Sequence, residues 1–165
     1  MNKELRDRAA SAGIPLMDFI LKRIRDLELQ TGIRRTIFAV CPNSLSVIRA
    51  ALISAKRCNA PIKFAATLNQ VDLDGGYTGL TPSECVKTIR LYARNLHVTS
   101  PVIIAIDHGG PWLKDLHILE KWPYLKTMAA VKKSFEAAAI VESSIESAMD
   151  RYFFKFNLVG LNNLL

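Results

Sequence analysis

The stretch 61-PIKFAATLNQVDLDGGYTGLTPSE-84 carries three signals that decide the fold: an apolar run, a glycine-rich loop and a helix start. The run over 61–68 is short and β-prone, which is typical of a strand buried in a parallel sheet. Thr81, Pro82 and Glu84 then occupy the N-cap, N1 and N3 positions of a capping box, where the missing N–H of proline costs nothing. The stretch therefore predicts a strand, a long loop and a helix that begins at Pro82.

The same order of elements occurs on both sides of this stretch. An apolar run at 36–40 precedes a helix that Asn43 or Ser44 caps, and a third run, 101-PVIIAI-106, precedes a helix over 127–149. An amphipathic helix over 16–32 comes before all of them, with Gly32 as its stop. Strands that alternate with helices at this spacing predict βαβ units and a parallel sheet.

Composition limits the class of protein. The 165 residues are enough for one domain with a real core, and no run of about eighteen uncharged apolar residues predicts a transmembrane helix. The first residues lack the apolar centre of a signal peptide, so we expect a cytoplasmic protein. The net charge of +7 comes from lysines and arginines scattered among acids, a pattern that argues against a nucleic-acid partner.

The three cysteines, Cys41, Cys58 and Cys85, are widely spaced and odd in number. That arrangement argues against a disulfide framework and against a cysteine zinc site. We expect them to be small buried hydrophobic residues in a reducing compartment.

The residues with special chemistry lie where each predicted strand ends. These exits are Cys41–Asn43, Asn69–Thr81 and Asp107–Trp112. Because the carboxyl ends of parallel strands meet at one edge of the sheet, where ligands bind, the sequence predicts a site that all three exits share.

Counting positions excludes three familiar loops for the glycine-rich exit. A calcium loop that starts at Asp72 needs glycine and glutamate where Tyr77 and Ser83 stand. The glycines read GGxxG rather than GxGxxG, and no glycine is followed by Lys-Ser/Thr. Two readings stay open. Adjacent glycines, the hydroxyls of Tyr77 and Thr78 and the helix start at Pro82 suit an anion, whereas the simpler alternative is a turn before a well-capped helix.

The third exit places Asp107 next to His108. A neutral imidazole is a good zinc ligand, and an adjacent carboxylate can transfer a proton or orient its neighbour. His97 and His117 do not stand at clear ligand spacing from the pair, so a plain polar loop is the alternative.

Three blocks of sequence resemble one family in order and separation. The blocks 39-AVCPNSLSVIRAAL-52, 66-ATLNQVDLDGGYTGLTP-82 and 107-DHGGP-111 are similar to successive motifs of the non-catalytic (Z-type) subunit of class II D-tagatose-1,6-bisphosphate aldolase. The middle block, with NQVD followed by GGYTG and TP, is the most specific of them. One departure is Ala65, where the family usually has an acidic residue.

The resemblance implies a (β/α)8 TIM barrel and a cytoplasmic subunit that supports a separate catalytic class II aldolase subunit in galactitol or amino-sugar catabolism. In related catalytic aldolases an Asp-His pair after a barrel strand supplies an acid/base carboxylate and a zinc ligand. Those roles would fall on Asp107 as the catalytic residue and on His108 as the ligand of Zn²⁺. The residues implied to bind the sugar bisphosphate are Asn69, Gln70, Gly75, Gly76, Tyr77 and Thr78.

Length is the second departure from the family, because a complete barrel takes roughly 250 residues. We expect one partial barrel domain holding the first three to four βα units. It comprises an N-terminal helical segment over 1–32, family-like units over 33–138 and a divergent tail over 139–165. The hypothesis is a truncated family member in which 150-DRYFFKFNLVG-160 covers the open sheet edge, or in which copies self-associate along that edge.

Two other functions stay open beside the accessory subunit. One is a metal-dependent sugar-phosphate aldolase in its own right, which would need further His or Glu ligands on later strands. The other is an inactive fragment of either protein.

Overall fold

A three-stranded parallel sheet is the centre of the fold. The computed structural model describes residues 3–143, in which the strands β1 (Phe38–Val40), β2 (Ile62–Ala66) and β3 (Val102–Ile106) lie in the order β1-β2-β3. Phe38 pairs with Ile62, and Ile62 pairs with Val102, so the strands start level with one another. The three predicted strands and their parallel arrangement are confirmed, each slightly shorter than its apolar run.

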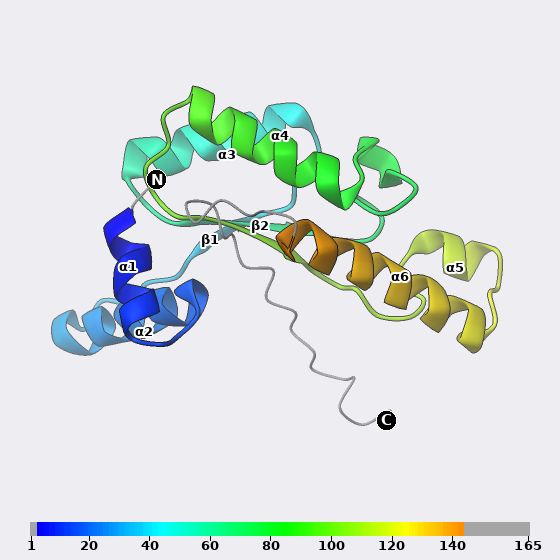
Figure 1. Cartoon of the computed structure of the whole chain (residues 1–165), viewed down its shortest axis with the longest axis horizontal. Helices are drawn as coiled ribbons and strands as arrows, with labels where there is room; N and C mark the ends of the chain where they lie inside the picture. Colours follow the sequence, from blue (N-terminus) through cyan, green and yellow to red (C-terminus); the bar gives the residue numbers. More distant parts are fainter. Residues whose placement is uncertain (1–2, 144–165) are drawn as a thin grey trace.

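Helices α3 (Leu45–Cys58) and α4 (Pro82–Asn95) cover one face of the sheet (Figure 1). Their apolar stripes bury Leu52 and Ile89 completely against Phe64 and Ile104 of the strands. Ser44 caps α3 by accepting from the amide of Val47, which settles the choice between the two predicted caps. The predicted capping box of α4 is present in both directions.

Two N-terminal helices lie on the other face of the sheet (Figure 1). Helix α1 (Lys3–Ser11) and helix α2 (Leu16–Thr31) bury Ala9, Leu16 and Ile20 together with Ile103 of β3. Gly32 adopts φ 66° and ends α2, as predicted, because only glycine takes the left-handed conformation without cost. Side chains alternate along β3, so Ile103 meets these helices while its neighbours Val102 and Ile104 meet the opposite layer.

The chain after β3 differs from the prediction in two places. A short helix, α5 (Asp115–Leu119), lies in what the sequence suggested was a loop, and α6 (Tyr124–Ser143) begins three residues earlier than expected. Helix α6 packs beside α4. The predicted end of this helix at 149 and the segment 150–160 lie outside the described residues. No helix within residues 3–143 is long and apolar enough to cross a membrane.

The expectation for the cysteines holds for only one of the three. Cys85 is buried on α4, but Cys41 and Cys58 are exposed, so the prediction of burial was wrong for both. The reason is their position: Cys58 is the last residue of α3, and Cys41 lies in the loop after β1.

Candidate functional site at the strand exits

Side-chain hydrogen bonds connect the exits of β1 and β2. The side-chain oxygen of Asn43 accepts from Gln70 Nε2 at 2.5 Å and from the hydroxyl of Tyr77 at 2.9 Å. Gln70 is only 6% exposed, and its Oε1 accepts from the amide of Thr67 at 2.9 Å. Both ends of the Gln70 amide are therefore bonded, which fixes one orientation of this buried side chain. Tyr77, by contrast, is 63% exposed and presents its ring to solvent.

The glycine-rich loop is folded against its own backbone. A short 3₁₀ helix, η1 (Gly76–Thr78), is held by the amide of Tyr77 donating to Asn69 O at 2.8 Å and by the Thr78 hydroxyl donating to Gln70 O at 2.6 Å. A Cβ on Gly76 would stand 2.5 Å from Gln70 O, and Gly76 has φ 52°. Only glycine fits at this position, because a Cβ has no room and because the backbone has a positive φ.

The amides of the two adjacent glycines are already used within this loop. Gly75 donates to Asp72 O at 2.8 Å, and Gly76 donates to the side chain of Asp74 at 3.0 Å. What these glycines provide in this conformation is positive φ and close packing of the turn. Their contact with a ligand stays a prediction.

A buried lysine connects the β2 exit to the segment that follows the β3 exit. Lys114 Nζ donates to Asp72 at 2.6 Å and to Asp74 at 2.7 Å. The side chains of Lys114 and Asp72 are 10% and 7% exposed, whereas that of Asp74 is 54% exposed. Charges so little hydrated are tolerated only when paired, and so Lys114 and Asp72 each stabilise the other.

Asn69 adds a second connection between the same two segments. Its amide nitrogen donates to the carboxylate of Asp115 at 3.0 Å, and its oxygen accepts from the backbone amide of Asp115 at 2.9 Å. The two bonds use both polar atoms of the Asn69 side chain. Side chains thus join the exits of β1 and β2 to each other and the exit of β2 to residues 114–115, which follow the predicted third exit. A ligand site shared by all three predicted exits stays a prediction.

The predicted Asp107–His108 pair lies at the exit of β3. His108 Nε2 is 3.5 Å from the carboxylate of Asp107, and the side chains are 70% and 45% exposed, respectively. His108 has φ 51°, a conformation that a non-glycine residue rarely adopts. At the next residue, Gly109, a Cβ would stand 2.4 Å from the ring of Phe135, so that ring would have to shift to admit a side chain.

The described residues do not by themselves form a zinc site. Zinc in proteins takes three or four protein ligands, and no group of three His, Cys, Asp or Glu side chains within the described part of the chain is arranged to hold a metal ion. His117 is buried and stacked on Trp122, with 4.8 Å between ring centroids. Burial, and then the charge of Lys114, lower the pKa of His117.

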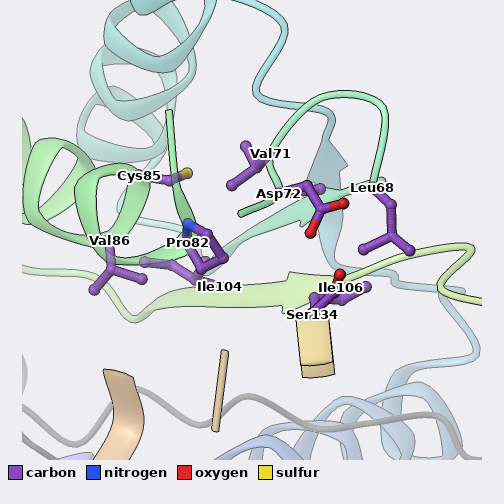
Figure 2. Close-up of a pocket in the computed structure, with 10 residues that line it drawn as sticks. Leu68, Val71, Asp72, Pro82, Cys85, Val86, Ile104, Ile106 and Ser134 are labelled. Carbon is purple, nitrogen blue, oxygen red and sulfur yellow. The ribbon is translucent and has the colours of Figure 1, made fainter. Parts of the chain in front are cut away.

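A small cavity lies between the sheet and α4, behind the glycine-rich loop (Figure 2). Its volume is about 10 Å³, and its lining includes Asp72, Cys85, Ile104 and Ser134. This is about the space of one water molecule, too little for a sugar. Burial raises the pKa of the Cys85 thiol to about 12, so this cysteine stays protonated and unreactive at neutral pH.

The Lys114 cluster leads to a prediction about pH. Burial, the largest single effect on Asp74, opposes its ionisation, but the hydrogen bonds from Lys114 and from the amide of Gly76 and the charge of Lys114 together outweigh burial, and the pKa of Asp74 is lowered in the folded protein. A lowered pKa contributes stability above the unfolded value, about 3.9, and the contribution is lost as the pH falls through the folded value. The difference in unfolding free energy between wild type and Asp74→Asn should therefore be constant from pH 5 to 8 and shrink below pH 4. Urea titrations at each pH measure it, and a difference that grows below pH 4 contradicts the prediction.

The sequence did not reveal Lys114 as a site residue. The available signal was a pair of acids, Asp72 and Asp74, in a loop that follows an apolar run. Their partner lies some forty residues further along, at a separation of 42 positions from Asp72. Asp115 was missed for the same reason, because its partner Asn69 is 46 positions away.

The comparisons with known proteins agree with the resemblance seen in the sequence. A crystal structure of a probable tagatose 6 phosphate kinase from Sinorhizobium meliloti 1021 is similar over 65% of this chain, with 32% identity and a TM-score of 0.54. The chain spans 27% of the length of that protein. Residues 22–152 match the model of a family described as D-tagatose-1,6-bisphosphate aldolase subunit GatZ/KbaZ-like, which is well over half of the chain. This protein belongs to that GatZ/KbaZ-like family of aldolase subunits.

Proposed function

We propose that this chain acts as an accessory subunit that supports a catalytic class II tagatose-1,6-bisphosphate aldolase in galactitol or amino-sugar catabolism in the cytoplasm. The observation that carries the proposal is the set of side-chain bonds at the strand exits, which hold the family motif 69–78 in one conformation. Membership of a family of aldolase subunits gives that motif its context.

The proposed architecture is the first part of a (β/α)8 barrel of the TIM type. Three parallel strands in sequential order with α3 and α4 on one face are the pattern of successive βα units in such a barrel. In a complete barrel the opposite face, where Ala39 and Ile103 lie, points to the interior. Self-association along the sheet edge stays a prediction, to be read from the oligomeric state in solution.

The proposed ligand is the sugar bisphosphate, which would meet the strand exits. Tyr77 would face it with its hydroxyl group, Thr78 would support the loop through its bond to Gln70 O, and the fixed amide of Gln70 would hold Asn43 and Tyr77 in position. Asp107 and His108 lie at the same edge of the sheet and are exposed enough to reach a ligand. Each of these residues would bind or orient the ligand, and no bond-breaking step is assigned to them.

The test is reconstitution with the catalytic subunit. The chain is added to a catalytic class II aldolase subunit, and cleavage of tagatose 1,6-bisphosphate and the partner's half-life at a fixed temperature are measured. We expect the chain to raise one or both, and to cleave nothing by itself. A Tyr77→Phe variant should reduce the effect, while Tyr92→Phe, a tyrosine of α4 away from the exits, should not.

Two results would overturn the proposal. Turnover with stoichiometric zinc by this chain alone would make it an aldolase in its own right. No change in the partner's rate or half-life, together with no binding between the two, would favour an inactive fragment.

A further inference from the structure

A second cavity lies at the opposite end of the strands from the proposed site. Its volume is about 510 Å³, and it is bounded by α1 and α2 and by residues at or just before the start of each strand: 35–38, 59–61 and 100–101. The family motif lies at the carboxyl ends instead, one strand of five residues away, or about 16 Å. The volume is within the range of small-molecule sites, roughly 300–1,000 Å³.

Most of the wall of this cavity is apolar. Ile20 and Ile24 project from α2, and Ile37, Pro61 and Pro101 come from the strand starts. Ile20 is 4% exposed and belongs to the buried cluster that joins the helices to the sheet, so the wall is part of the folded core. A ligand that fills this space needs an apolar body.

One buried hydroxyl in the lining has no partner. Ser100 is 3% exposed, and its Oγ makes no hydrogen bond within the described part of the chain. Leaving a buried polar group unpaired costs about 1–3 kcal/mol. Because this oxygen has almost no accessible surface, a molecule in the cavity would contact the rest of the lining and not this hydroxyl.

Two arginines give the same cavity a positive charge. Arg35 donates only through Nη1, to Leu27 O, Thr31 Oγ1 and Ile33 O, and no carboxylate among residues 3–143 pairs with it. Its Nε and Nη2 donors are left over, in a fork that suits a carboxylate. Arg23 lines the cavity too, and reaches Asp26 only at 3.9 Å on the surface.

From these features we infer that this cavity binds a small amphipathic carboxylate with a body of about six to eight carbon atoms. The carboxylate would pair with Arg35 and Arg23, which are exposed, and the hydrocarbon would lie against Ile20, Ile24 and Ile37. This binding function is separate from the proposed aldolase partnership, because it uses neither the strand exits nor the family motif.

The test uses octanoate as the probe, with the full chain labelled with ¹⁵N. We expect saturable chemical-shift changes at the amides of Ile37, Ala60 and Ser100, and none at Tyr77. Because a charge-assisted hydrogen bond is worth about 1.4 kcal/mol or more, Arg35→Gln should weaken binding about tenfold. Arg25→Gln is the control, since Arg25 is an exposed arginine of α2 that does not line the cavity.

A second variant and a second probe keep the inference open to refutation. Ala60→Leu places bulk in the cavity wall and should abolish binding while the circular dichroism spectrum is unchanged. 1-Octanol, which has the same chain length but lacks the charge, should bind at least tenfold more weakly than octanoate. The inference fails if octanoate causes no saturable shifts at the cavity, if Arg25→Gln weakens binding as much as Arg35→Gln, or if octanol binds as tightly.

Discussion

Replacing Lys114 with methionine is expected to lower the free energy of unfolding by about 3 kcal/mol, the lower end of the range for breaking a buried ion pair. Methionine keeps most of the side-chain volume but removes the charge that Asp72 needs. Asp72 is 7% exposed at its side chain and would be left as an unpaired buried carboxylate. Urea unfolding at pH 7 measures the change.

The two acids should contribute unequally to this loss. Asp74 is 54% exposed and can turn to water, so Asp74→Asn should cost about 1 kcal/mol or less. The double variant Lys114→Met with Asp72→Asn removes both buried charges and should recover part of the stability lost in Lys114→Met alone.

The matched control for Lys114 is Lys132→Met. Lys132 is 78% exposed at its side chain and pairs with Glu136 on the surface of α6 at 3.9 Å. It should change the unfolding free energy by about 0.5 kcal/mol or less. Equal losses for Lys114→Met and Lys132→Met would show that the Lys114 cluster contributes nothing special to the fold.

Replacing Gly76 with alanine should disrupt the conformation of the family motif. The new Cβ would stand 2.5 Å from Gln70 O and 2.6 Å from Asn69 O, closer than carbon and oxygen tolerate, and both contacts are with backbone. The backbone of 69–76 must therefore move, which strains the bonds that η1 makes with Asn69 and Gln70. We expect the free energy of unfolding to fall by about 3 kcal/mol or more, at or above the upper end of what most single substitutions cause.

Gly79 provides a control for Gly76 within the same loop. It too has positive φ, at 74°, but a Cβ there would meet nothing within 4 Å. Gly79→Ala should therefore lower the free energy of unfolding only by the strain of alanine in the left-handed conformation, about 1–2 kcal/mol. Chemical denaturation compares the two variants, and amide shifts at Asn69 and Tyr77 report the loop itself. A Gly76→Ala variant with wild-type shifts and no greater loss than Gly79→Ala would refute the steric argument.

Local chemistry made much of this fold predictable from sequence. The capping box at Thr81 and Glu84, the glycine stop at Gly32 and the short apolar strands each depend on residues close together in the chain. Propensity and capping act within one or two turns, so a sequence reveals them directly. Helix α5 was missed because only five residues form it, with no side-chain cap to mark its start.

The sequence by itself determined the order of the strands and of helices α2, α3, α4 and α6, the family and the location of its motif at the strand exits. Only the tertiary structure decided which side chains meet there: Lys114 with Asp72, Asp115 with Asn69, and Asn43 with both Gln70 and Tyr77. These partners are 27 to 46 positions apart, so nothing in the local sequence connects them. Parallel strand pairing brings them together, because it places the carboxyl ends of all three strands at one edge of the sheet.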